Sequence, residues 1–146
     1  MRVGNALRAE DTFEFFKEVL GDPDGAKSPK RILLCSGKIY YDLLRQRQHK
    51  KASHIEIIRL EQLYPFPAEQ LAKSIKSYKN SVAWCWVQEE PENMGGWRFL
   101  QPLLESVIGK SVSYIGREPA SSPATGFPAI YKEEQAAIVE KAMHET

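Results

Sequence analysis

Two short apolar runs constrain the fold of this chain most: "RILLC" at 31–35 and "VAWCWV" at 82–87. Strands with apolar side chains at nearly every position must be covered on both faces, as in parallel sheets. Two further strand-like segments, at 55–60 and 111–116, alternate with segments of helical spacing. The expected helices are 38–51, 68–79, 96–108 and 131–145. This alternation predicts a three-layer α/β/α fold with a mostly parallel sheet.

The residues before this pattern are typical of an arm and a linker. In "DTFEFFKEVL" (11–20) the apolar residues share one helical face, and Asp11 or Thr12 is the candidate N-cap. The following "GDPDGAKSPK" is rich in glycine, proline and aspartate, as linkers are. We therefore expect residues 1–29 to form a helical arm with its linker, and residues 30–146 to form the α/β domain.

Charge and cysteine content argue against several classes of protein. The chain has 20 basic and 19 acidic residues, a net charge of +1, so no broad field draws it to nucleic acid or to an anionic membrane. Cys35 and Cys85 lie inside apolar runs and are interpreted as buried thiols, which suit a reducing compartment. The histidines stand far apart, so no structural metal is expected: His49, His54 and His144. One basic run is interpreted as a solvated helix face: Arg45, Arg47, Lys50 and Lys51.

The turn "CSGK" joins an apolar strand to a helix, a place where backbone N–H groups attract anions in this class of fold. Ser36 and Lys38, with Arg117 from "GREPASSPATG", are therefore candidate contacts for a small anion or effector. Neither GxGxxG nor a P-loop pattern is present. A simpler interpretation, which we favour, has Ser36 capping the helix and Arg117 pairing with Glu118 or Glu90.

Two adjacent glutamates, Glu89 and Glu90, close the second apolar run in "VQEEPENMGGW". Neighbouring residues of a strand point to opposite faces, so the two carboxylates are poor partners as a catalytic acid and base. We expect one glutamate to face a partner or the crevice at the carboxyl ends of the strands. The other is expected to meet solvent or a basic side chain. The two glycines allow a sharp turn into the next helix.

Aromatic residues beside prolines and glycines mark a possible contact with a neighbour. The segment "YPFP" (64–67) either presents Tyr64 and Phe66 to another domain or subunit, or packs over this domain's own core. The two alternatives have equal support from the pattern. The tryptophans recur at core periodicity and do not form a stacking platform: Trp84, Trp86 and Trp97. Trp97 follows the glycine turn, and we also expect apolar surface around it.

Four segments together resemble one family: "LLCSGKIYYDLL", "IIRLEQLYPFP", "VQEEPENMGGW" and "GREPASSPATG". Their order and approximate spacing are similar to those near the carboxyl end of the decarboxylating, thiamine-diphosphate-dependent component of 2-oxoglutarate dehydrogenase, and of relatives that act on 2-oxoadipate. The resemblance runs from about Thr12 to Glu145. It implies a transketolase C-terminal-domain-like fold, the third domain of a larger enzyme.

The resemblance also implies what surrounds such a domain. Enzymes of the family are homodimers that bind thiamine diphosphate and magnesium in their other two domains, so this chain alone is expected to bind neither. The parent reaction is the oxidative decarboxylation of 2-oxoglutarate in the tricarboxylic acid cycle, with acyl transfer to the lipoyl group of a partner acyltransferase. The expected compartment is the bacterial cytoplasm or, in a eukaryote, the mitochondrial matrix.

Three functions are therefore open. The leading one is an interface and assembly domain that is inactive alone and has no catalytic, cofactor-binding or metal-binding residues. Its expected contact residues are Tyr64, Phe66, Glu89, Glu90 and Trp97. The alternative is a regulatory module that binds a small anion, a nucleotide or acyl-coenzyme A through Ser36, Lys38 and Arg117. A third is a hydrolase that uses Glu89 or Glu90.

Overall fold

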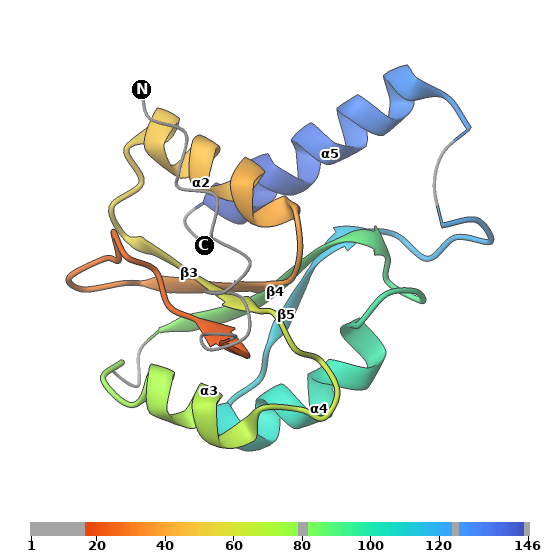
Figure 1. Ribbon diagram of the computed structural model, residues 1–146. Helices are drawn as coiled ribbons and strands as arrows, with labels where there is room; N and C mark the ends of the chain where they lie inside the picture. The colour runs from red at the N-terminus through yellow and green to blue at the C-terminus, as the bar shows by residue number, and fades with distance from the viewer. Residues whose placement is uncertain (1–16, 79–81, 124–125, 145–146) are drawn as a thin grey trace, which may run out of the picture.

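The computed structural model describes residues 17–78, 82–123 and 126–144. They form a five-stranded sheet in the order β1-β3-β2-β4-β5, in which β1 is antiparallel to β3 and all other neighbours are parallel (Figure 1). The strands are β1 (Val19–Leu20), β2 (Arg31–Cys35), β3 (Ile55–Leu60), β4 (Ala83–Pro91) and β5 (Ser113–Arg117). The helices are α2 (Ile39–Lys50), α3 (Ala68–Ile75), α4 (Trp97–Ile108) and α5 (Pro128–Met143). Helices α2 and α5 cover one face and α3 and α4 the other, which confirms the predicted α/β/α architecture.

The apolar runs that predicted the sheet form its buried centre. Every residue of β2 is buried, and its side chains alternate between two apolar clusters. Leu33 and Cys35 pack with α2 and α5, whereas Ile32 and Leu34 pack with α3 and α4. Each cluster removes a continuous apolar surface from water, which is the main force that holds the three layers together. Burial raises the pKa of the Cys35 thiol to about 12, as suits an inert core cysteine.

Two elements end at other places than predicted. Strand β4 continues to Pro91 instead of stopping at 87, because β5 still pairs with it after β2 has ended. Helix α3 ends at Ile75, since the chain turns there and the Tyr78 hydroxyl donates a hydrogen bond of 2.7 Å to the buried carboxylate of Glu56. Both differences follow from contacts with distant segments.

Two helices begin at other places than their patterns indicate. Helix α4 begins at Trp97, one residue after the predicted start, and continues through Pro102. Helix α5 begins at Pro128 instead of 131. A proline suits the first helical turn, because its missing N–H would have no partner there and its φ angle is already helical.

The segment before β2 contributes to the sheet. The helix predicted over 11–20 is wrong at its end, because Val19–Leu20 form the edge strand β1. An open edge of β3 offers backbone N–H and C=O groups that these two residues pair with. Residues 11–16 of that prediction lie outside the described part of the chain. The division into an arm (1–29) and a domain (30–146) stays a prediction.

A buried ion pair fixes this segment to the domain. The Asp22 side chain is wholly buried, and both of its carboxylate oxygens accept hydrogen bonds from the Arg47 guanidinium. One of these oxygens also accepts the backbone N–H of Ile57 at 3.2 Å. The interpretation of Arg47 as part of a solvated face is therefore wrong, because only 8% of its side chain is exposed. Its neighbour Arg45 does lie in solvent.

Candidate functional site

The chain connections diverge at the carboxyl ends of β2 and β4. The two strands are neighbours, yet β2 leads into α2 on one face of the sheet and β4 leads into α4 on the other (Figure 1). In open α/β sheets, ligands bind in the crevice at such a switch point. The turn at 36–38 and the end of β4 border this crevice. We call the side of the sheet where all parallel strands end the carboxyl edge.

Glu89 lies at the end of β4 and gathers three donors on one carboxylate oxygen, Oε1. The Lys38 ammonium is 3.2 Å away, the Tyr131 hydroxyl donates at 3.1 Å and Gln135 Nε2 donates at 3.0 Å. Lys38 also donates to the Tyr131 oxygen at 3.2 Å, so Tyr131 links the cation to the anion. The hydrogen bonds to Tyr131 and to Glu89 raise the pKa of Lys38. The structure thus joins a residue of the "CSGK" turn to one of the paired glutamates.

Arg117, at the end of β5, also contacts Glu89, but through the backbone. Its Nε donates to the Glu89 carbonyl oxygen at 2.7 Å, and its two terminal nitrogens reach Glu134 Oε2 at 3.4 Å and the Pro123 carbonyl oxygen at 2.9 Å. The predicted pairing with Glu118 or Glu90 is therefore wrong. The pairing of Arg117 with Glu134 could not be predicted without knowing where α5 lies, because the two residues belong to different elements.

The predicted cap of α2 by Ser36 is also wrong. The N-cap position of α2 is occupied by Lys38, and no side chain caps it. Gly37 has φ of +76°, the left-handed backbone that glycine tolerates best, so the tight turn itself is confirmed. Of the three residues predicted to contact an anion, Lys38 and Arg117 meet at Glu89, and Ser36 does not join them.

Gln88 organises the "VQEEPENMGGW" segment, although the sequence pattern did not single it out. Its side-chain oxygen accepts hydrogen bonds from Trp86 Nε1 at 2.8 Å and from the Trp97 backbone N–H at 3.1 Å. Its side-chain nitrogen donates to the carbonyl oxygens of Met94 at 2.8 Å and Pro91 at 3.1 Å. One buried carboxamide thereby ties the end of β4, the turn and the start of α4 together. The sequence held one sign of this role, because Gln88 is a polar residue directly after the apolar run 82–87.

Two glycines leave room for this arrangement. Gly95 has φ of +65°, and a Cβ added there would lie 3.1 Å from the Gln88 side chain. Gly116 lies opposite the irregular part of β4, between the pairs Val87↔Ile115 and Pro91↔Arg117. A Cβ on Gly116 would come within 2.1 Å of the Tyr114 hydroxyl and 3.0 Å of the Gln88 carbonyl oxygen. The bulge in β4 therefore depends on a glycine in the facing strand.

The two adjacent glutamates face different surroundings, as the alternation of a strand predicts. Glu89 points toward α5 and is 18% exposed, whereas Glu90 is exposed to solvent. The two carboxylates do not converge, and Glu89 is already held by a lysine, a tyrosine and a glutamine. The geometry gives the hydrolase hypothesis no acid–base pair.

Exposed apolar side chains gather at the carboxyl edge. The large apolar residues that the described segments expose are Tyr41, Tyr64, Phe99, Phe127 and Ile130. Each lies in the loop after a parallel strand or in the first turn of the helix that follows it. Within 17–78, 82–123 and 126–144 the opposite edge exposes none. A one-sided distribution of this kind is typical of a surface that another protein segment covers.

The predicted interface aromatics have different environments. Tyr64 is 82% exposed and its ring lies 6.3 Å from that of Phe99. Phe66 is partly buried against the cluster beneath α3 and α4. The "YPFP" segment therefore packs on the domain's own core through Phe66 and exposes Tyr64 to solvent. Trp97 is 5% exposed and belongs to the core. The expectation of exposed surface at Trp97 is therefore wrong, and its core periodicity is confirmed.

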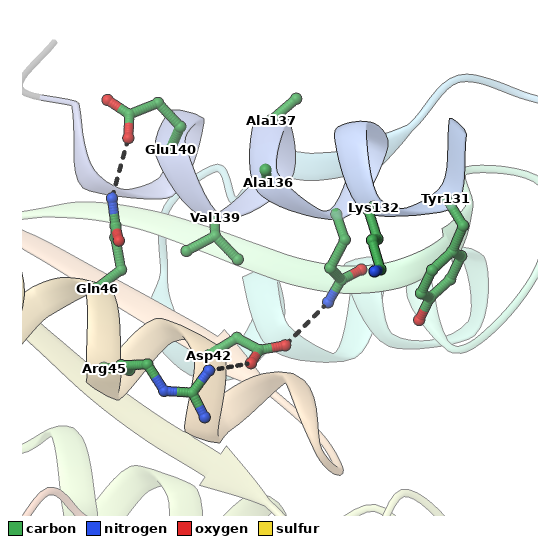
Figure 2. Close-up of a pocket in the computed structure, with 10 residues that line it drawn as sticks. Asp42, Arg45, Gln46, Tyr131, Lys132, Ala136, Ala137, Val139 and Glu140 are labelled. Atoms are coloured by element: carbon green, nitrogen blue, oxygen red, sulfur yellow. Dashed lines mark hydrogen bonds and ion pairs between the residues drawn. The ribbon is translucent and has the colours of Figure 1, made fainter. Parts of the chain in front are cut away.

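A groove of about 580 Å³ runs beside the Glu89 cluster, between α2 and α5 (Figure 2). Asp42 and Gln46 rise from α2 toward α5, and Gln46 donates to Glu140 at 3.1 Å. Asp42 accepts from Gln135 at 3.2 Å, on the same side of α5 as Glu89. The lining carries both signs of charge, so it does not select an anion or a cation.

Neither a metal site nor a membrane span is found in the described residues. Among residues 17–78, 82–123 and 126–144, no group of three histidine, cysteine, aspartate or glutamate side chains could hold a metal ion. Within the same ranges, no helix has the length and apolar character needed to cross a bilayer.

The fold is a three-layer α/β domain similar to that of a solved transketolase chain. A chain of a split-gene transketolase, described as an inactive β4 tetramer, aligns with a TM-score of 0.53 at 16% identity, over 81% of this chain and 40% of that chain. The sequence narrows the class, because the family model described as 2-oxoglutarate dehydrogenase C-terminal matches residues 8–143. The chain belongs to this family, as the resemblance predicted.

Longer proteins share this domain. The 2-oxoglutarate dehydrogenase E1 component of Haemophilus influenzae is 42% identical over 132 residues, which cover 88% of this chain and 14% of that protein. The Cupriavidus necator protein of the same name is 41% identical over 131 residues, covering 87% and 14%. A probable 2-oxoadipate dehydrogenase complex component E1 homolog of Dictyostelium discoideum is 40% identical over 124 residues, covering 82% and 14%. The chain thus spans about one seventh of the length of these relatives.

Proposed function

We propose that this chain is the assembly domain of a 2-oxoglutarate dehydrogenase-type enzyme and docks through its carboxyl edge onto the remaining domains and the second subunit. One observation carries the proposal: the exposed large apolar side chains of the described residues all lie at that edge. Docking would bury them together with the exposed Glu90 and the Lys38–Glu89 pair. Of the contacts proposed from the sequence, Tyr64, Phe66 and Glu90 stay available on this edge, whereas the Glu89 carboxylate is engaged within the chain.

The chemistry of the whole enzyme belongs to other domains. By family, the reaction is the oxidative decarboxylation of 2-oxoglutarate or 2-oxoadipate with acyl transfer to the lipoyl group of a partner, in the bacterial cytoplasm or the mitochondrial matrix. By family, thiamine diphosphate and magnesium bind in the other two domains, and we propose that this chain alone binds neither. Glu89, an acid at the switch point, is already engaged by three donors. We therefore assign no catalytic step to this chain.

A reconstitution experiment tests the assembly role. The full chain is mixed with the Haemophilus influenzae relative lacking its matching segment, and binding is followed by sedimentation velocity. Tyr64→Ser with Phe99→Ser should weaken binding about tenfold or more, because exposed aromatics at an interface centre carry much of the affinity. The control pair Lys76→Ser with Lys110→Ser alters exposed residues at the opposite edge and should leave binding unchanged. Absence of binding by the unmodified chain, or equal losses in the two pairs, contradicts the proposal.

The alternative, a site for a small anion, nucleotide or acyl-coenzyme A at Ser36, Lys38 and Arg117, stays a prediction. The geometry favours it less, because Lys38 pairs with Glu89 and Arg117 pairs with Glu134. A bound anion would have to compete with both carboxylates. Thermal unfolding with added ATP or acetyl-coenzyme A separates the two functions: a saturable rise in Tm that Lys38→Ala abolishes would support the alternative.

A further inference from the structure

Helix α5 has two halves that are held in different ways. Its buried residues all lie in the second half: Ile138, Val139, Ala142 and Met143. We call residues 128–137 the first half, although they are ten of the 16 residues of the helix; they contribute no buried side chain and project past the sheet and α2 (Figure 1). Hydrophobic packing therefore fixes only the second half of the helix, and the first half must be held by other contacts.

Those other contacts are polar, and they meet at Glu89. Tyr131 and Gln135 both donate to its carboxylate, at 3.1 Å and 3.0 Å. Its backbone carbonyl accepts from Arg117 at 2.7 Å, and Arg117 in turn reaches Glu134 on the same half of α5. Tyr131, Glu134 and Gln135, which share one side of the helix, are thus tied, directly or through Arg117, to one residue of β4. Two other contacts reach the same part of the helix: Gln135 donates to Asp42 at 3.2 Å, and Lys38 donates to the Tyr131 hydroxyl at 3.2 Å.

The half-helix held in this way carries two of the apolar side chains exposed at the carboxyl edge. Phe127 is 69% exposed and Ile130 is 45% exposed. Tyr131, the next residue, is the one bound to Glu89. The position of Glu89 therefore sets where this apolar pair stands relative to the rest of the edge.

We propose that Glu89 is a positioning residue: its carboxylate holds the first half of α5 so that Phe127 and Ile130 form a preset docking element. The proposal rests on the assembly role. The occupant is the remainder of the same enzyme, since the relatives extend far beyond this domain. A preset element docks more tightly than a mobile one, because less conformational freedom is lost on binding.

Hydrogen–deuterium exchange on the full chain tests the positioning step without any partner. In Glu89→Ala, the amides of residues 132–137 should exchange about tenfold faster or more, because hydrogen bonds to a charged acceptor are lost and local opening becomes easier. Exchange in β2 should stay unchanged. The matched control is Glu90→Ala, the adjacent acid, whose side chain makes no hydrogen bond or ion pair within the described residues. Tyr131→Phe is a milder second variant, which removes one donor and should accelerate the same amides less.

The exchange outcomes decide the first step. Unchanged exchange at 132–137 in both Glu89→Ala and Tyr131→Phe overturns the proposal. Equal acceleration in Glu89→Ala and Glu90→Ala overturns it too, since the effect would not depend on the contact. If Glu89→Ala unfolds the whole chain, Tyr131→Phe alone decides.

Binding in the reconstitution experiment tests the second step. Glu89→Ala should weaken binding about tenfold or more, and should have little further effect when Phe127→Ser and Ile130→Ser are already present, because it acts through those residues. Fully additive losses would show that Glu89 contacts the partner by itself, which overturns the positioning role. If the unmodified chain does not bind, the assembly role fails and with it the docking element. The exchange result then still shows whether Glu89 holds α5.

Discussion

The Arg47 guanidinium donates hydrogen bonds to both carboxylate oxygens of Asp22, 25 positions away in the sequence, and both side chains are buried. Breaking such a pair leaves a charge buried without its partner, which costs more than the pair itself contributes. Asp22→Ala or Arg47→Ala should therefore lower the free energy of unfolding by about 3–5 kcal/mol. Urea titration measures the loss.

Arg45→Ala is the matched control for this prediction. Arg45 lies on the same helix and pairs with Asp42 at 3.4 Å, but 79% of its side chain is exposed. Its removal should cost less than about 1 kcal/mol. Comparable losses of stability for Arg45→Ala and Arg47→Ala would show that burial does not determine how much an ion pair contributes to the free energy of unfolding.

Gln88→Met should destabilise the turn between β4 and α4. The substitution keeps the volume nearly constant but leaves Trp86 Nε1, the Trp97 N–H and the Met94 carbonyl oxygen without their Gln88 partner. The Pro91 carbonyl oxygen keeps the Met94 N–H as a donor at 2.8 Å. Each buried polar group left unpaired costs about 1–3 kcal/mol. Chemical denaturation followed by tryptophan fluorescence measures the loss, and Gln70→Met on the exposed side of α3 is the control. A stability equal to that of the control would refute the organising role of Gln88.

Stability should fall at alkaline pH. Burial raises the pKa of Tyr114 from 10 to about 12, so the folded chain keeps this proton at pH values where the unfolded chain releases it. The contribution is fully present below pH 10 and is lost as the pH rises toward about 12. Tyr114→Phe should flatten part of this decline in unfolding titrations. The rest comes from the other groups whose pKa values are raised: Tyr40, Tyr78, Cys35, Cys85 and Lys38. A profile that Tyr114→Phe leaves untouched speaks against this assignment.

Both thiols should be inert in the folded chain. Cys35 is wholly buried and Cys85 is 4% exposed, and burial raises the pKa of each, so the reactive thiolate is scarce. Iodoacetamide should label neither residue in buffer at neutral pH and both in denaturant, as peptide mass spectrometry would reveal. Rapid labelling of Cys35 without denaturant would mean that the layer formed by α2 and α5 opens readily.

The strands were predictable because their signal is local. The observed bounds of β2 and β3 are the same as the predicted ones. Runs of mostly apolar residues that are covered on both faces can be recognised without knowing which strands they pair with. The edge strand Val19–Leu20 was missed because two residues carry no periodicity, and the open edge of β3 decides their conformation. The extension of β4 to Pro91 likewise depends on β5.

The candidate site was predictable only in part. Alternation along a strand indicated that Glu89 and Glu90 diverge, which the structure confirms. The partners of Glu89 could not be predicted, because Tyr131 and Gln135 lie about forty residues further along the chain and meet it only once α5 crosses the sheet. The same holds for Arg117 with Glu134.

The central place of β2 makes folding of the chain depend on distant residues. The connection from β2 to β3 contains α2, and the connection from β2 to β4 contains α2, β3 and α3. Parallel pairings of this kind are slow, so we expect folding in milliseconds to seconds and not in microseconds. Until β4 arrives, one side of β2 is an open apolar edge that other chains can pair with. The segment that identifies the fold is thus also the one most prone to aggregate before the sheet is complete.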